Sequence, residues 1–294
     1  MEFKSVVEFE GKVIVEKVRD FELPHIFDCG QCFRWDKQEN GNYIGVAFNR
    51  VIEVEKNGDD VIIYNSSLKD FNDIWINYFD MERDYTAIKM EFEKDELLKK
   101  AVEFGYGIRI LKQDPFEMLI SFIISANNRI PMIKRAIGNI SRIYGKPLEY
   151  KENTYYTFPT LEEFSRCTLE EVEAIGVGFR AKYIVKAVQD LSSGNYNLRD
   201  IMLRGDDGCH EGLQQFSGVG PKVADCIMLF SMGKYSAFPV DVWVKRAMQF
   251  FYVAPDVSLP KIRMFGREKF GDLSGFAQQY LFYYARENNI KIDV

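Results

Sequence analysis

Residues 213–225 read LQQFSGVGPKVAD, an apolar helical segment that continues through Gly218-Val-Gly220 directly into a second helix. Glycine adopts backbone conformations that other residues avoid, so the two glycines permit a tight turn with exposed N–H groups. These groups lie at the start of the following helix, where the helix dipole favours an anion. The spacing predicts a helix–hairpin–helix at about 207–232, which is either a phosphate clamp or a simple connector.

Lys222 lies in the first turn of the second predicted helix, and Cys226 follows one turn later on the same face. A cation at this end of a helix opposes the dipole. If Lys222 is also partly buried, its pKa falls and the neutral amine becomes available as a nucleophile. The alternative is a solvated surface lysine beside a small buried thiol, and the spacing alone leaves both open.

Asp241 follows Pro239 in the stretch FPVDVW, just before a segment with helical spacing. The proline interrupts the chain there, so Asp241 is a good helix N-cap. One interpretation is that it only caps the helix. The other is a carboxylate beside the reacting centre, held by helix N–H groups and so kept ionised near neutral pH.

The N-terminal part of the chain reads as strands. Asn40-Gly41 and Asn57-Gly58 fall between apolar runs, and Asn-Gly is a strong hairpin signal. No helix-length connection is available for parallel crossovers, so the sequence predicts an antiparallel sheet. The expected strands lie within 13–18, 33–35, 43–48, 50–56 and 60–65.

From about residue 73 the apolar spacing becomes helical. Thr160 and Thr168 each precede a glutamate by three residues, the capping-box pattern that opens a helix. We therefore expect an α+β protein: an antiparallel β domain with flanking helices over 1–108, then an all-helical domain over 109–294. Further helices are expected at 115–126, 131–144, 180–191, 207–216, 222–232, 241–252, 260–270 and 274–287.

Composition excludes several classes of protein. The 294 residues are 47% hydrophobic and 28% charged, which is globular, and the longest apolar runs are too short for a membrane span. The N-terminus has no secretory pattern, and five cysteines, an odd number, indicate reduced thiols in an intracellular protein, in the cytoplasm or nucleoid if the source is prokaryotic. Cys29-x-x-Cys32 is a lone pair, either a zinc or redox pair or an ordinary one near a strand.

The net charge of −6 is unevenly spread, because residues 1–104 are acidic and residues 105–294 carry a slight basic excess. A polyanion would therefore contact the second part of the chain, through local groups more than through a general field.

These motifs together resemble the helix-hairpin-helix/Gly-Pro-Asp superfamily of DNA glycosylases, and in particular 8-oxoguanine DNA glycosylase/AP lyase. The resemblance implies a TATA-binding-protein-like β domain before the helical glycosylase domain. It is carried, in the family's order, by 30-GQCFRW-35, 125-SANN-128, 178-GFRA-181, 218-GVGPKVADC-226, 238-FPVDV-242 and 276-FAQ-278 with Phe282.

By this resemblance, the chain extrudes 8-oxoguanine from duplex DNA and removes it. Lys222 attacks C1′ and then holds the sugar as a Schiff base for β-elimination, while Asp241 stabilises the cationic sugar. The carbonyl of Gly30 accepts the N7–H that guanine lacks. Gln278 binds the Watson–Crick edge, and the base lies between Phe282 and Cys226.

On the other strand, the resemblance implies that Asn127 and Arg180 contact the base opposite the lesion and that Phe179 wedges into the gap. Two positions depart from the family. Met132 replaces an arginine of the cytosine-reading set, and a thioether cannot donate a hydrogen bond, so we expect weaker discrimination for cytosine. Trp243 stands where the family often has a histidine near a phosphate, which puts that contact in doubt.

No cysteine follows Cys226, so the iron–sulfur loop of related glycosylases is not expected, nor is another cofactor or metal. The expected partner is double-stranded DNA containing 8-oxoguanine, bound by a monomer with no membrane association. Two alternatives remain: a monofunctional glycosylase for another damaged purine, against which Lys222 argues, and a non-catalytic DNA-binding module.

Overall fold

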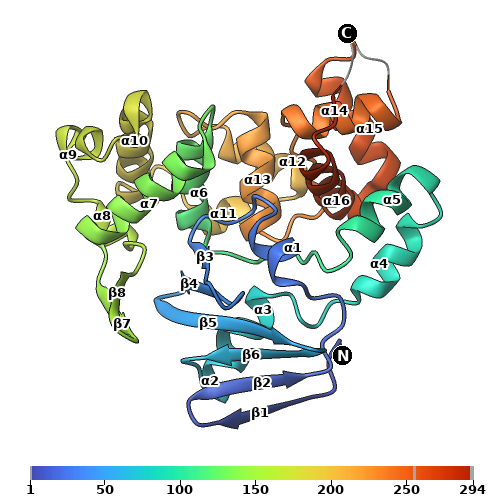
Figure 1. Ribbon diagram of the computed structural model, residues 1–294. Coiled ribbons are helices and arrows are strands. Elements are labelled where there is room, and N and C mark those ends of the chain that lie inside the picture. Colours follow the sequence, from blue (N-terminus) through green and yellow to red (C-terminus); the bar gives the residue numbers. More distant parts are fainter. Residues whose placement is uncertain (1, 254–255, 292–294) are drawn as a thin grey trace.

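The N-terminal strands form a six-stranded antiparallel sheet in the order β1-β2-β6-β5-β4-β3 (Figure 1). The computed structural model describes residues 2–253 and 256–291. The sheet confirms the predicted antiparallel arrangement. Its strands are β1 (Ser5–Phe9), β2 (Lys12–Glu16), β3 (Trp35–Lys37), β4 (Tyr43–Ala47), β5 (Arg50–Asn57) and β6 (Asp60–Tyr64).

Short turns set much of the register of this sheet. Asn57 pairs with Asp60 across a tight turn in which Gly58 has φ +58, a conformation that favours glycine. Gly41, with φ +89, lies in the longer connection between β3 and β4. The central pairing of β2 with β6 joins strands far apart in the chain, so no turn signal could have predicted it.

Short helices cover one face of the sheet. Trp35 and Trp75 are buried there, and Phe27 stacks on Trp35 with ring centroids 4.1 Å apart. The first of these helices ends at Phe27, immediately before the loop that contains Gly30, so its packing against the sheet positions that loop. The helices are α1 (Leu23–Phe27), α2 (Leu68–Asp70), the π-helical turn η1 (Phe71–Trp75) and α3 (Ile76–Tyr78).

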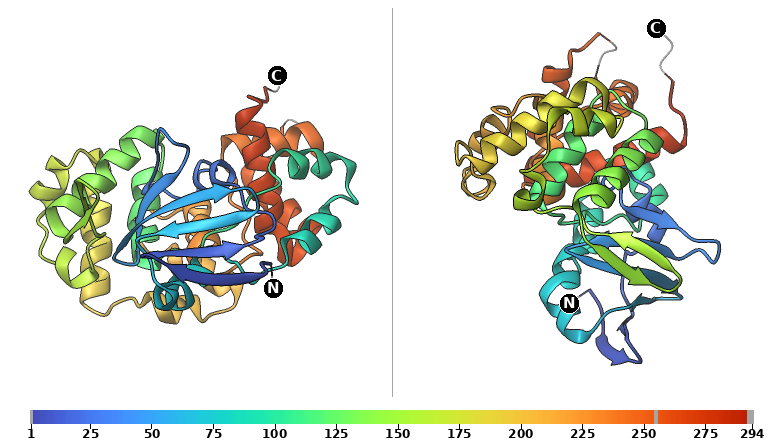
Figure 2. Two further views of the ribbon diagram at one scale, coloured as in Figure 1. Left: turned by 60° about the horizontal axis from the view of Figure 1, so that its bottom comes forward. Right: turned by 90° about the vertical axis from the view of Figure 1, so that its left-hand side faces the viewer.

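The rest of the chain is mostly helical and lies above the sheet (Figures 1 and 2). Its elements are α4 (Tyr85–Phe92), α5 (Glu96–Phe104), α6 (Pro115–Ser125), α7 (Ile130–Tyr144), α8 (Leu161–Phe164), α9 (Leu169–Ala174), the 3-10 turn η2 (Gly178–Arg180), α10 (Ala181–Ser192), α11 (Leu198–Met202), α12 (Asp206–Leu213), α13 (Pro221–Ser231), α14 (Val242–Phe251), α15 (Leu259–Phe270), the 3-10 turn η3 (Gly271–Leu273) and α16 (Ser274–Glu287).

Most predicted helices are confirmed within a few residues. Thr160 and Thr168 both make complete capping boxes with the glutamates three residues later. Helix α6 is buried from Glu117 to Ile124, as its apolar sequence predicted, and it packs against α13. In residues 2–253 and 256–291, no helix is long and apolar enough to cross a membrane.

The hairpin of β7 (Pro147–Tyr150) and β8 (Asn153–Tyr156) was not expected inside the helical part. Its Leu148 and Tyr150 pack on Val46 and Val51 of the large sheet. This contact buries side chains that the hairpin alone would expose, so tertiary packing rather than a local sequence signal stabilises the two strands.

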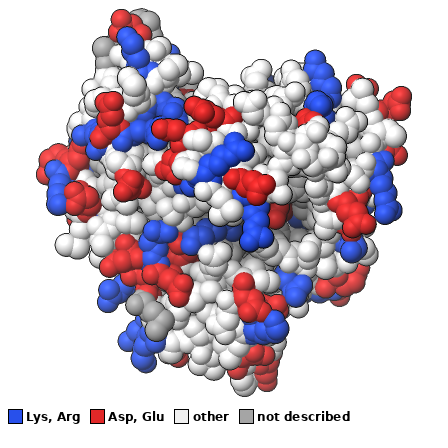
Figure 3. Space-filling view, turned by 180° about the vertical axis from the view of Figure 1, so that it is seen from behind, with Lys and Arg blue, Asp and Glu red and all other residues white. Residues whose placement is uncertain are grey.

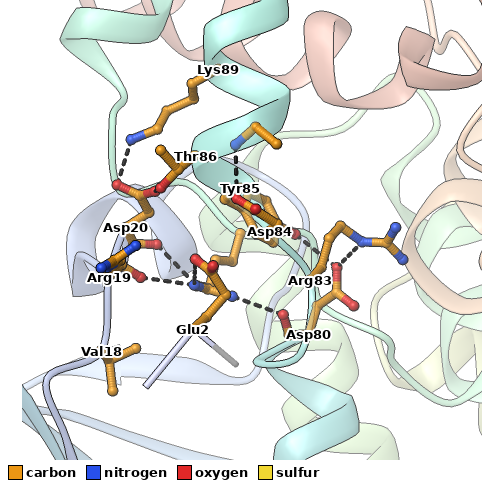
Figure 4. A network of polar contacts seen from close by, with 12 residues as sticks. Glu2, Val18, Arg19, Asp20, Asp80, Arg83, Asp84, Tyr85, Thr86 and Lys89 are labelled. Carbon is orange, nitrogen blue, oxygen red and sulfur yellow. Dashed lines mark hydrogen bonds and ion pairs between the residues drawn. The ribbon is translucent and has the colours of Figure 1, made fainter. Parts of the chain in front are cut away.

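The fully buried Arg109 lies where the sheet and the helical body meet. Its guanidinium donates hydrogen bonds to the backbone carbonyls of Arg19, Asp20 and Asp80, at 2.7–2.9 Å. These acceptors surround Glu2 (Figure 4), whose carboxylate lies 3.6 Å from Arg109. The predicted start of the helical domain thus coincides with an arginine that ties the two parts of the chain together.

Candidate active site

A cavity of about 530 Å³ opens between the loop before β3 and helices α6, α13, α14 and α16. It brings together residues that lie up to about 250 positions apart in the sequence. Eight of the predicted site residues line it: Gly30, Asn127, Lys222, Cys226, Asp241, Trp243, Gln278 and Phe282.

Lys222 is in the first turn of α13, which begins at Pro221, one residue before the predicted start. Its Nζ hydrogen-bonds with Cys226 and lies 5.4 Å from the ring centroid of Phe122. Burial lowers the pKa of Lys222, but neighbouring Cys226 and Asp241 outweigh burial and raise that pKa above its ordinary value. The expected depressed pKa is therefore wrong for the free protein.

Cys226 is buried, and burial raises the pKa of its thiol to about 11. The Lys222 charge opposes burial and lowers the pKa of the thiol, just as Cys226 raises the pKa of Lys222.

Asp241 caps α14, and its Oδ1 accepts hydrogen bonds from the backbone N–H groups of Trp243 and Val244 at 2.9 and 2.8 Å. The predicted N-cap is confirmed, and it does not exclude the second interpretation, because the same carboxylate lines the cavity. Burial raises the pKa of Asp241, while these hydrogen bonds and the Lys222 charge oppose that effect.

Gln278 and Phe282 extend from consecutive turns of α16 into the cavity. Gln278 is 4% exposed, and its Oε1 has no hydrogen-bond partner among the described residues. A buried amide oxygen without a donor is costly, which is a physical sign that a ligand supplies one. Gly30 has φ +78, and a Cβ there would lie 3.1 Å from the Phe282 ring.

Two further residues of α16, not singled out from the sequence, line the cavity. Gln279 donates to the carbonyl of Cys29 at 2.7 Å, and Arg286 donates to the carbonyl of Asp28. Residues seven apart share a helix face, so the period from Gln279 to Arg286 was a signal that could have found them.

Phe179 and Arg180 lie outside the cavity, on the turn η2. Phe179 is 59% exposed and so is free to insert between bases. Arg180 is buried and donates to the carbonyls of Ala126, Asn127 and Val177, so it holds the loop that carries Asn127. In this structure its guanidinium is committed to the protein rather than presented to a partner.

Met132 is 45% exposed and lines a second hollow, together with Asn127, Asn128 and Arg129. Met132 lies in the first turn of α7, with the exposed cation of Arg129 beside it.

The two glycines of the hairpin, Gly218 and Gly220, meet different structural requirements. Gly218 has φ +85, and a Cβ there would lie 2.8 Å from the Tyr183 ring, so both strain and space require glycine. Gly220 is the N-cap residue of α13, is exposed, and has open space beside it. Together they leave the first turn of α13 accessible to an anion.

Over the described ranges, no group of three or more His, Cys, Asp or Glu side chains is arranged to hold a metal ion. The surface seen from behind mixes basic and acidic side chains without an extended field of one sign (Figure 3). A nucleic acid on this face would therefore rely on local contacts.

Comparisons with known proteins agree with this arrangement. Residues 13–119 match the family model of the 8-oxoguanine DNA glycosylase N-terminal domain, and residues 120–271 match that of the HhH-GPD superfamily base excision DNA repair proteins.

The chain is 32% identical over 281 residues to the N-glycosylase/DNA lyase OGG1 of Arabidopsis thaliana, covering 88% of this chain and 76% of that protein. It is 33% identical over 232 residues to a probable N-glycosylase/DNA lyase of Methanothermobacter thermautotrophicus, covering 72% of each.

Among solved structures, it resembles the Clostridium acetobutylicum 8-oxoguanine glycosylase/lyase bound to double-stranded DNA containing cytosine opposite 8-oxoguanine. The TM-score is 0.98 at 62% identity, over 99% of this chain and 100% of that one. The chain therefore belongs to the 8-oxoguanine DNA glycosylase family of the helix-hairpin-helix/Gly-Pro-Asp superfamily.

Proposed function

We propose that this chain is a bifunctional glycosylase/AP lyase that removes 8-oxoguanine from duplex DNA and then cleaves the strand. The observation that carries the proposal is the shared cavity, which is lined by Lys222, Asp241 and Gln278, whose buried amide oxygen has no hydrogen-bond partner among the described residues. The names of the relatives in Arabidopsis thaliana and Clostridium acetobutylicum support the same activity.

The flipped base lies between the Phe282 ring and Cys226. The guanine Watson–Crick edge carries N–H donors, which satisfy the lone Oε1 of Gln278. The Gly30 carbonyl accepts N7–H, the donor by which 8-oxoguanine differs from guanine. A site built around one such bond rejects a base that lacks it, because the buried acceptor is left unpaired.

In the chemical step, neutral Lys222 attacks C1′, the C1′–N9 bond breaks, and its electron pair leaves with the base. Ring opening gives an iminium, the C2′ proton is removed, and the C3′–O bond breaks in β-elimination. Asp241, fixed by two backbone N–H groups, stabilises the positive charge that develops on the sugar. The pKa of Lys222 is raised in the free protein, so its ammonium must first lose a proton.

Phe179 wedges into the gap in the duplex, and Asn127 makes a polar contact with the opposite strand. Arg180 supports that contact by holding the Asn127 carbonyl. Trp243 and the hairpin glycines Gly218 and Gly220 adjoin the DNA backbone. The protein acts as a monomer on genomic DNA, inside the cell.

Borohydride trapping on a duplex with one 8-oxoguanine tests the proposal, since it reduces a Schiff base to a stable adduct. The wild type forms a covalent adduct and Lys222→Gln forms none while still binding the duplex. Lys261→Gln, which replaces an exposed lysine on α15 outside the cavity, is the matched control and keeps the adduct.

Two other results would each indicate a different function for this chain. Base release without an adduct means a monofunctional glycosylase, and DNA binding with neither base release nor an adduct means a binding module.

A further inference from the structure

The backbone carbonyls around Gly30 are individually held by side-chain donors. Arg286 Nη2 donates to the Asp28 carbonyl, Gln279 Nε2 to that of Cys29 at 2.7 Å, and Gln113 Nε2 to that of Gln31 at 2.8 Å. Among the residues that the structure describes, no donor reaches the Gly30 carbonyl between them. Within residues 28–31, the free carbonyl of Gly30 is thus flanked on both sides by carbonyls that have fixed donors.

The backbone at Gly30 is also tightly constrained. Its φ of +78 is a left-handed conformation, and the Phe282 ring and Arg286 Nη1 lie 3.1 and 3.6 Å from the position of a Cβ. A small rotation of the neighbouring peptide planes would turn the free carbonyl away, and the bonds to the flanking carbonyls resist such a rotation.

The donors come from the helix that also contacts the base. Gln278 and Phe282 extend into the cavity from α16, while Gln279 and Arg286 of the same helix hold the loop. One rigid element therefore sets the distance between the two edges of the base-binding site. Gln279 is only 1% exposed, so its bond is shielded from water.

We propose that Gln279 and Arg286 are positioning residues that aim the Gly30 carbonyl at the N–H in position 7 of the base and so set selectivity for 8-oxoguanine. This inference rests on the proposed function. Neither residue takes part in the attack on C1′, so loss of either lowers discrimination at position 7 without removing the nucleophile.

The test compares two duplexes that differ only in this donor, one with 8-oxoguanine and one with 8-oxo-7-deazaguanine, which has C–H at position 7. Their dissociation constants are measured in a Lys222→Gln background, where neither base is released. Selectivity is the dissociation constant for 8-oxo-7-deazaguanine divided by that for 8-oxoguanine. This ratio falls by roughly fivefold in Gln279→Leu and in Arg286→Met, the factor that one hydrogen bond of ordinary strength contributes.

Arg286→Lys keeps a donor for the Asp28 carbonyl and restores most of the ratio. Asn288→Ala, which removes a bond to the Tyr284 carbonyl at the end of α16, is the matched control and leaves it unchanged. With Lys222 restored, each variant still cleaves a preformed abasic site, a step that needs no base.

An unchanged ratio in both Gln279→Leu and Arg286→Met overturns the proposal. So does a loss of abasic-site cleavage together with a lowered melting temperature, because the two side chains would then act only on folding. If the wild type releases no 8-oxoguanine, the proposed function itself has failed, and this outcome is separate because it involves no variant.

Discussion

Lys222 shows how a single side chain can be placed correctly by the sequence and still behave differently from expectation. Because its pKa is raised in the free protein, nearly all of the amine is protonated at neutral pH. Below that pKa, the neutral fraction grows tenfold for each pH unit. We therefore expect the single-turnover rate of 8-oxoguanine release to rise with pH between 6 and 9, with the logarithm of the rate increasing by about one per unit.

Rapid quenching with enzyme in excess over the duplex measures this rate without a contribution from product release. The rate of abasic-site cleavage is followed in parallel, since it uses the same amine. A rate that stays level from pH 7 to 9 would show that Lys222 is already deprotonated in the DNA complex, contrary to its raised pKa in the free protein.

Gly30 is a second residue whose role can be isolated. Gly30→Ala adds a methyl group 3.1 Å from the Phe282 ring and forces alanine into a left-handed conformation, at φ +78. Gly11→Ala imposes similar strain at φ +74 in open space, so it is the matched control. We expect both to lose about 1–2 kcal/mol of stability in urea unfolding.

Only Gly30→Ala should also slow 8-oxoguanine release, by about tenfold or more, since it displaces Phe282 and the free carbonyl. Equal rates of release in the two variants would mean that the loop does not contact the base.

At the scale of elements, we expect the start of α7 to determine how the opposite strand is read. Met132 offers no donor to cytosine. Release of 8-oxoguanine opposite C, A, G and T should therefore differ by less than about 100-fold, the discrimination that well-placed hydrogen bonds exceed. Met132→Arg should raise the preference for C by about tenfold, whereas Met264→Arg, on the exposed side of α15, should leave it unchanged. A wild-type preference for C above about 100-fold would contradict this prediction, and Arg129 would then be the donor to test.

The elements also show what the sequence can and cannot predict. The capping boxes at Thr160 and Thr168 and the Gly218–Gly220 turn are local signals, and the helices they predicted are present. The β2–β6 pairing and the β7–β8 hairpin depend on contacts between distant residues, so no local pattern indicated them.

The site shows the same contrast between local sequence signals and contacts between distant residues. The family motifs pointed to the residues that we expect to act as the nucleophile and to bind the base, and these residues line one cavity. Gln279 and Arg286 were missed because their partners are backbone carbonyls 250 or more residues away. The pKa of Lys222 was misjudged because the sequence does not show how closely Cys226 and Asp241 approach the buried amine in the folded chain.

At the scale of the molecule, the sheet and the helices must stay in a fixed relation, because Gly30 comes from the first part of the chain and Lys222 from the second. Helices α4 and α5 reinforce this relation: they precede the proposed boundary at residue 108, yet Tyr85, Phe92 and Leu98 lie in the core of the helical body. The matched family models meet later, at residues 119 and 120. The two domains are thus interlocked across the boundary rather than joined by a linker.

Arg109 is the residue on which this relation depends most. Arg109→Leu keeps an apolar side chain at this position but removes the guanidinium, which leaves the carbonyls of Arg19, Asp20 and Asp80 and the buried Glu2 carboxylate without their donor. We expect it to lower the free energy of unfolding by at least about 3 kcal/mol, the usual cost of removing one partner from a buried charged network. Urea unfolding followed by the fluorescence of the buried Trp35 and Trp75 measures the loss on the sheet side.

Arg166→Leu removes an equal charge from an exposed position and should change stability by less than about 0.5 kcal/mol. Because Gly30 reaches the cavity only while the sheet is docked, Arg109→Leu should also slow 8-oxoguanine release at temperatures where the protein is still folded. Abasic-site cleavage, which depends on Lys222 in the helical body, should fall less. A stability loss under about 1 kcal/mol, or an equal fall in both activities, would show that packing between the domains holds the site together without Arg109.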